Sequence, residues 1–167
     1  MCIREDGQMK ARLNYGNAAP GVYAALDALD QYLGECSLDE SVLNLVRLRV
    51  SQINGCAYCV DMHWKDLRAL GESEQRLYSL DAWRECPYYT DRERAALTWA
   101  EAVTMLSDGH VSEHVYEEVC SHFSERELCD LTLAVATINA WNRISISARL
   151  VPGGYQPAKR SEAMAEA

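Results

Sequence analysis

The stretch that most constrains the fold of this chain is LTLAVATINAW, residues 131–141, which is apolar on nearly every side of a helix. A helix that is apolar all round has to be buried by neighbours on several sides. The stretch lies within a longer helix that we expect over about 125–150, ended by Pro152-Gly153-Gly154. The sequence therefore predicts a central, buried helix surrounded by other helices.

The rest of the chain also carries helical signals, and it contains no convincing series of strands. Glycine and proline are sparse and fall at boundaries such as Asn54-Gly55. Three Ser/Thr-x-x-Glu patterns, which let a hydroxyl and a carboxylate bind free amides at a helix start, begin at Ser37, Thr90 and Ser124. The helices expected before the central one cover about 20–35, 40–53, 56–70, 73–83, 91–106 and 112–122.

We expect one all-α domain with short flanking segments. A length of 167 residues, with 49% apolar and 25% charged residues, suits a single hydrophobic core. We place an N-terminal segment at residues 1–19, the helical domain at 20–151 and a polar, mobile C-terminal tail at 152–167.

The net charge and the number and spacing of the cysteines indicate which partners and which cellular compartment to expect. A net charge of −9 argues against nucleic acid and against an anionic membrane surface as partners. The N-terminus MCIREDGQMK lacks the apolar part of a secretory signal, and no apolar run reaches membrane-spanning length. Seven cysteines, most of them scattered, are untypical of a secreted disulfide scaffold. We expect a cytoplasmic protein, in which a close cysteine pair serves catalysis or metal binding.

The segment NGCAYCVDMH, residues 54–63, contains such a pair. Cys56 and Cys59 are three residues apart and His63 lies four beyond the second, so all three project along one stripe of a helix. Gly55 places Cys56 near the helix N-terminus, where free amides favour a thiolate. An imidazole within reach of Cys59 can act as its base.

Three interpretations of this pattern stay open on spacing alone. Two thiols can complete a redox cycle without a cofactor: peroxide oxidises one to a sulfenic acid, and the other condenses with it to a disulfide. An external dithiol then resets the pair. The same residues form half of a zinc site, although the other half is missing from the sequence. The third interpretation is two small buried side chains beside an ordinary helical histidine.

The run LVRLRVSQINGCAYCVDMH, residues 45–63, resembles the alkylhydroperoxidase D-like branch of the carboxymuconolactone decarboxylase family. Residues 73–85, 90–104 and 122–144 are similar to the same family, and the resemblance covers most of 20–150. It implies an all-α fold that assembles as homo-oligomers, either trimers or hexamers. It also implies a thiol-dependent peroxidase in antioxidant defence, which takes a peroxide as substrate and an external dithiol or thioredoxin-like protein as reductant.

The resemblance also implies a role for each residue of the motif. Cys59 corresponds to the thiol that attacks peroxide, Cys56 to the resolving thiol and His63 to part of a proton relay. The position at the helix N-terminus would by itself favour Cys56 as the thiolate. The spacing of His63 from Cys59 argues for Cys59 and agrees with the family.

One position departs from the family pattern. Related sequences commonly read Glu-Leu-Val-x-Leu-Arg before the motif, and the glutamate helps to relay protons through the histidine. Here that position is Asn44, whose amide can hydrogen-bond an imidazole but cannot accept its proton. Glu101 is our candidate for a substitute carboxylate, although a glutamate in a helix is more often a solvated surface residue.

Three further residues are candidates for the wall of a pocket. Tyr58 lies between the two cysteines and, with an unperturbed pKa of about 10, fits packing better than proton transfer. Trp141 and Asn142 interrupt the apolar helix, where buried polar groups need partners. They fit the site, a subunit interface, or ordinary buried hydrogen bonds equally well.

Two other functions stay open beside the peroxidase. A lactone enzyme of the decarboxylase type has no evident use for a Cys-x-x-Cys pair. A non-enzymatic redox sensor or metal-binding oligomer would use the cysteines without turnover. Peroxide consumption that depends on Cys59 separates the peroxidase from both.

Overall fold

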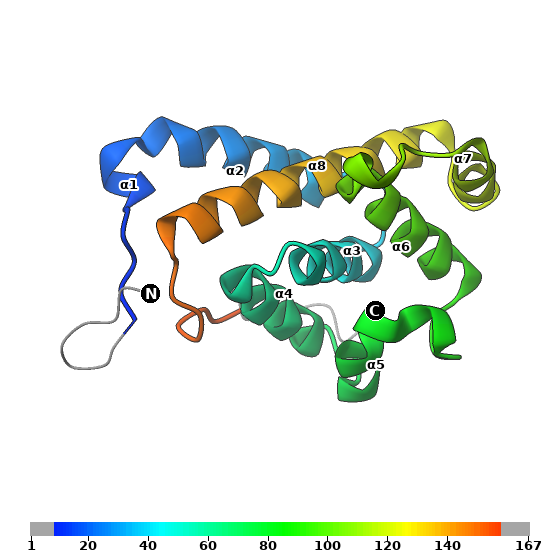
Figure 1. Ribbon diagram of the computed structural model, residues 1–167, viewed down its shortest axis with the longest axis horizontal. Coiled ribbons are helices and arrows are strands. Elements are labelled where there is room, and N and C mark those ends of the chain that lie inside the picture. Colours follow the sequence, from blue (N-terminus) through cyan, green and yellow to red (C-terminus); the bar gives the residue numbers. More distant parts are fainter. Residues whose placement is uncertain (1–8, 158–167) are drawn as a thin grey trace, which may run out of the picture.

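The computed structural model describes residues 9–157, which form helices joined by short loops, with no β-strand in this range (Figure 1). The predicted all-α class is confirmed. In the same residues no helix has both the length and the apolar character needed to cross a membrane. The helices are α1 Tyr15–Ala18, α2 Pro20–Gly34, α3 Glu40–Ile53, α4 Ala57–Ala69, α5 Glu74–Ser79, η1 Leu80–Glu85, α6 Asp91–Thr104, η2 Leu106–Asp108, α7 Glu113–Cys120 and α8 Glu125–Ala148.

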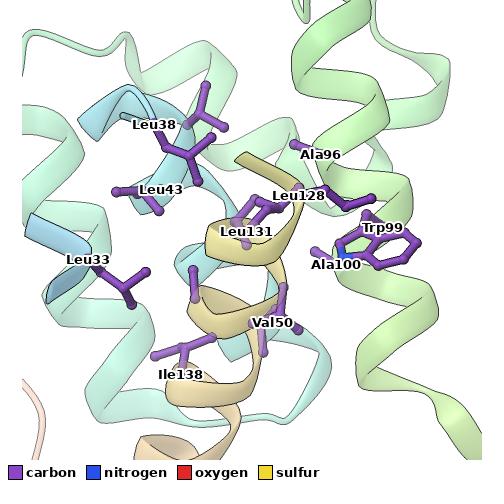
Figure 2. Packing of buried hydrophobic residues seen from close by; sticks show 14 of the residues in the cluster. Leu33, Leu38, Leu43, Val50, Ala96, Trp99, Ala100, Leu128, Leu131 and Ile138 are labelled. Carbon is purple, nitrogen blue, oxygen red and sulfur yellow. The ribbon is translucent and has the colours of Figure 1, made fainter. Parts of the chain in front are cut away.

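The central helix predicted from the apolar stretch is α8. It packs against α2, α3, α4 and α6, and Figure 1 shows α3 between α8 and α4. Figure 2 shows Leu131 and Ile138 of α8 among side chains from α2, α3 and α6. The helix ends at Ala148, because Arg149 adopts a left-handed conformation with a φ of 53° before Pro152 is reached.

Two of the three predicted capping boxes are present, at Thr90 before α6 and at Ser124 before α8. The box predicted from Ser37 to Glu40 is wrong. The residue before α3 is Asp39, and Glu40 is the first residue of the helix. Ser37 therefore lies outside the helix, and Glu40 is two positions short of the place from which a glutamate reaches back to the cap.

The hydrophobic core has two parts. The larger lies between α2, α3, the start of α4, α6, α7 and α8, and it includes Cys56 and Cys59. The smaller lies between α3, α4, α5, η1 and α6, and it includes Leu48, Leu67 and Trp83. Helix α3 contributes to both parts, so one helix packs against the cysteine pair on one side and against the second cluster on the other.

The backbone beyond α8 returns to α4. Lys65 Nζ donates to the carbonyl oxygens of Gly153 and Tyr155, each at 3.1 Å, and the Gly153 amide donates to Asp61 Oδ2 at 3.0 Å. The predicted mobile tail begins at residue 152, but its first residues are thus bound to α4. Residues 158–167 of that tail lie outside the described range.

The predicted N-terminal segment, residues 1–19, contains the short helix α1. The Arg12 amide donates to the carbonyl of Ala148 at 2.8 Å, which joins this segment to the end of α8. Residues 1–8 of the segment lie outside the described range.

Candidate active site

Cys56 immediately precedes α4 and Cys59 lies in its first turn, shortly after the chain leaves α3. Gly55 has a φ of 67°, a conformation that glycine adopts without the steric penalty of a side chain. Cys56 is the N-cap of α4, and its Sγ accepts a hydrogen bond from the Cys59 amide at 3.4 Å. Both cysteines are 1% exposed and both are free thiols. The helix start therefore brings two reduced thiols together in the core.

Hydrogen bonding distinguishes the two thiols. The hydrogen bond from the Cys56 thiol, together with those from the Ser145 and Asn142 side chains, outweighs burial and lowers the pKa of Cys59 to about 7. The pKa of Cys56 is raised, because its proton is held in the hydrogen bond to Cys59 and because the thiol is buried. The Cys59 amide and the Ser145 side chain favour a Cys56 thiolate, but the first two effects outweigh both. Cys59 is therefore the thiol that ionises first.

Two polar residues of α8 reach this first turn. Asn142 Nδ2 donates to Ser51 Oγ at 3.1 Å, and Asn142 Oδ1 accepts from Asn54 Nδ2 at 2.8 Å. Ser145 lies one turn further along α8 and is 4% exposed. Sequence reasoning missed Ser145; its spacing of three residues from Asn142 was the one available signal.

His63 lies one turn beyond Cys59 on α4 and is 6% exposed. Neither of its ring nitrogens has a hydrogen-bond partner within residues 9–157. Its Nδ1 lies 3.5 Å from Asp66 Oδ2. Burial lowers the pKa of His63 below 6.5 and outweighs the opposite effect of Asp66. Burial therefore favours the neutral imidazole, whose unpaired nitrogens can accept a proton.

Cys59 and His63 open onto one cavity of about 350 Å³. Tyr58 and Trp141 line it, as the sequence analysis predicts for a pocket. Some of the polar groups that line the cavity hydrogen-bond to one another. Asp30 accepts from Arg47 Nη2 at 3.0 Å and from Trp141 Nε1 at 2.7 Å. The remaining lining residues are Tyr23, Asp27, Met62, Ile138, Ser145 and Leu150.

Asn44 lines a neighbouring cavity of about 440 Å³ together with His63 and Asp66. Its Oδ1 accepts a hydrogen bond from Arg47 Nη1 at 3.4 Å. Asn44 makes no hydrogen bond to the imidazole among the described residues, although its amide is capable of one, since both nitrogens of His63 are unpaired. Asn44 thus lies near the histidine without holding it.

Glu101 is not brought to the cysteines or to His63. Its Oε1 accepts from Arg49 Nε at 2.7 Å and from Trp83 Nε1 at 2.9 Å, and its Oε2 accepts from Arg84. Burial opposes its ionisation, but the hydrogen bonds from Trp83, Arg84 and Arg49 outweigh it and lower the pKa of Glu101. The expectation that Glu101 substitutes for the missing glutamate fails, because both of its oxygens are already occupied.

The described residues do not support the metal interpretation of the motif. Between residues 9 and 157, no group of three or more histidine, cysteine or acidic side chains is arranged to hold a metal ion. The motif residues that lie together are the two thiols, the imidazole and the donors from α8. This set is suited to thiol chemistry with proton transfer.

Comparison with known proteins agrees with the fold and the motif. The sequence pattern of the carboxymuconolactone decarboxylase family matches residues 20–102. The uncharacterized protein YdfG of Bacillus subtilis (strain 168) is 40% identical over 139 residues, which cover 83% of this chain and 95% of YdfG. The chain belongs to the carboxymuconolactone decarboxylase family.

Two similar solved structures narrow the classification of the chain within this family. A protein of unknown function from Agrobacterium tumefaciens, assigned provisionally to the antioxidant defence protein AhpD, is 40% identical with a TM-score of 0.82, over 89% of this chain and 99% of that one. An uncharacterized peroxidase-related protein from Silicibacter sp. TM1040 is 27% identical with a TM-score of 0.71, over 78% of this chain and 70% of that one. Within its family the chain is AhpD-like.

Proposed function

We propose that this protein is a thiol-dependent peroxidase that reduces peroxides through a dithiol–disulfide cycle of Cys59 and Cys56. One arrangement carries the proposal: Cys59 lies beside a second thiol and shares a cavity with an unpaired imidazole. The lowered pKa of Cys59 agrees with that arrangement. Membership of an AhpD-like family is consistent with this chemistry.

In the first step, the Cys59 thiolate attacks the outer oxygen of a peroxide ROOH. The S–O bond forms while the O–O bond breaks, which leaves a sulfenic acid on Cys59 and an alkoxide RO⁻. His63, which has taken the proton of the Cys59 thiol, returns it to the alkoxide and the alcohol ROH leaves. Because burial lowers the pKa of His63, its imidazolium gives up the proton readily.

In the second step, Cys56 resolves the sulfenic acid. Its sulfur displaces the hydroxyl group of the Cys59 sulfenic acid, the S–S bond forms, and the hydroxyl leaves as water with the proton of Cys56. An external dithiol then reduces the disulfide by thiol–disulfide exchange and is itself oxidised to a disulfide. The raised pKa of Cys56 keeps this thiol protonated while Cys59 is the thiolate.

Peroxide consumption in the presence of a dithiol reductant tests the proposal. We expect Cys59→Ser to lower the turnover rate by about 10³-fold or more, because the nucleophile is lost. In the absence of the dithiol, Cys56→Ser should reduce one equivalent of peroxide and then stop as a sulfenic acid that a carbon-acid reagent traps. Cys120→Ser, which removes an exposed thiol of α7, is the control and should turn over normally.

The same variants separate the other candidate functions. A lactone decarboxylase would keep its activity when both Cys56 and Cys59 are replaced by serine. A redox sensor would form the disulfide once with peroxide but would not consume further peroxide with the dithiol present. Normal peroxide turnover by Cys59→Ser would contradict the proposed cycle directly.

We infer that the enzyme works in the cytoplasm as a homo-oligomer, either a trimer or a hexamer, with an external dithiol or a thioredoxin-like protein as reductant. The odd number of scattered cysteines fits a reducing compartment. The exposed aromatic side chains Tyr32, Tyr78 and Tyr116 offer surface that a second subunit could cover. Light scattering of the purified protein gives the mass, and a monomer would contradict the oligomer.

A further inference from the structure

The family pattern has a glutamate at the position of Asn44, and Glu101 does not replace it. The carboxylate beside His63 is that of Asp66, on the same helix. We propose that Asp66 is a positioning residue for His63, and that Tyr155, from the segment after α8, holds Asp66 in place. This inference rests on the peroxidase function proposed above and names how its proton relay is completed.

The geometry joins one oxygen of Asp66 to one nitrogen of His63. Asp66 Oδ2 lies 3.5 Å from His63 Nδ1, and the two side chains are 20% and 7% exposed. With Nδ1 turned toward Asp66, Nε2 is the nitrogen left to exchange a proton with a reactant in the Cys59 cavity. When His63 takes a proton, its cation faces a carboxylate at short range in a partly dry site, and the contact strengthens.

Tyr155 occupies the other oxygen of Asp66. Its hydroxyl donates to Asp66 Oδ1 at 2.7 Å, across 89 residues of sequence. Burial and this hydrogen bond raise the pKa of Tyr155, so the hydroxyl stays protonated and keeps donating. Since Lys65 binds the backbone carbonyl of Tyr155 at the same time, the residue is held at its backbone and at its hydroxyl.

The other charged groups that face His63 are less suited to this role. Arg47 of α3 lowers the pKa of His63, which disfavours the imidazolium. Asp30 of α2 raises it, but Asp30 already accepts hydrogen bonds from Arg47 and Trp141. Cys59 shares the cavity as the proposed proton source. Asp66 is the carboxylate in direct contact with the ring.

Titration of the His63 ring by NMR tests the contact without any turnover, so it is independent of the peroxidase proposal. The chain has four histidines, and a His63→Gln spectrum assigns the signal. We expect Asp66→Asn to lower the pKa of His63 by about one unit, because the imidazolium loses its carboxylate. Asp66→Glu should restore most of the shift.

Asp61→Asn is the matched control. Asp61 is also on α4 and also binds the segment after α8, through Lys65 and the Gly153 amide, but it makes no contact with His63 within the described residues. It should leave the pKa of His63 in place. An unchanged pKa in Asp66→Asn, or an equal fall in Asp61→Asn, would overturn the assignment of Asp66.

Peroxide kinetics then test the role of the contact. We expect Asp66→Asn to lower kcat/KM for peroxide about tenfold, with the acid limb of the pH profile moved to lower pH as the pKa of His63 falls. Tyr155→Phe keeps the ring and removes one hydrogen bond, so a fall of about threefold is expected, with a smaller shift of the same limb. A loss of rate with an unmoved acid limb would mean that Asp66 is merely structural.

Discussion

Two regions of this molecule each bury an ionisable side chain, and they satisfy it in opposite ways. Glu101 receives hydrogen bonds from Arg49, Trp83 and Arg84, which occupy both of its oxygens. His63 has no hydrogen-bond partner at either nitrogen among the described residues, and one carboxylate lies near it. A fully paired charge holds a fold in place, whereas unused hydrogen-bonding capacity is available to a reactant. The pairing of the group, more than its burial, separates the structural region from the reactive one.

The largest effect is expected where the paired charge is broken. Glu101→Ala leaves the Arg49 guanidinium, 14% exposed, without its buried partner. We expect the free energy of unfolding to fall by about 3 kcal/mol, measured by chemical denaturation. Asp81→Ala removes the other carboxylate bound to Arg49, but Asp81 is 77% exposed, so a fall of about 0.5 kcal/mol or less is expected. Equal losses of stability in Glu101→Ala and Asp81→Ala would contradict this difference between a buried and an exposed partner of Arg49.

The same carboxylate predicts a dependence of stability on pH. The folded-state pKa of Glu101 is lowered from its ordinary value of 4.5. Its contribution is therefore fully present above that value, and it is lost as the pH falls through the lowered folded-state pKa. The difference in stability between the protein and Glu101→Ala should shrink in that acidic range.

A smaller effect is expected from Ser145→Ala, which acts on the reactive region. Loss of this hydroxyl removes one hydrogen bond that favours the Cys59 thiolate, so the pKa of Cys59 should rise from about 7 by roughly one unit. The rate of Cys59 alkylation against pH, followed by mass spectrometry of the peptide, measures the midpoint. Ser147→Ala, at an exposed position two residues further on, is the control. A midpoint that stays at the wild-type value would remove Ser145 from the site.

The smallest effect is expected from Asn44→Glu, which returns the carboxylate of the family pattern to the cavity beside His63. Arg47, which already binds Asn44, would neutralise part of the charge of the new glutamate. We therefore expect kcat/KM for peroxide to rise by only about threefold, as the pKa of His63 moves up toward neutrality. Asn44→Gln changes the length without the charge and should give no gain. An unchanged or lower rate in Asn44→Glu would show that Asp66 already fills this role.

The sequence predicted the features that are local or periodic. The apolar run of α8, the approximate extent of the longer helices and the shared face of Cys59 and His63 on α4 depend on spacing along one helix, and spacing can be read directly. Cys56 is not on that helical stripe, because it precedes α4 as an extended N-cap residue. The capping box at Ser37 failed because Asp39 lies closer to the helix and serves as the cap residue. Boundaries set by competing neighbours are the least predictable.

The rest of the site depends on contacts between elements far apart in the chain. Ser145 reaches the thiols because α8 crosses the start of α4, and Tyr155 reaches Asp66 across 89 residues. The missing glutamate of the family pattern makes Glu101 the sequence candidate for a relay carboxylate. Its partners Arg49 and Trp83 come from α3 and η1, so spacing along one helix could not indicate that the carboxylate is already paired.

Cys56 is both a thiol of the proposed cycle and the residue that caps α4. Disulfide formation would turn its sulfur from the Cys59 amide toward the Cys59 sulfur, and the helix that carries His63 would lose that capping hydrogen bond. Each catalytic turnover would then loosen and restore the first turn of α4. The hydrogen-exchange rate of a single backbone amide, that of Cys59, would therefore report the oxidation state of the enzyme.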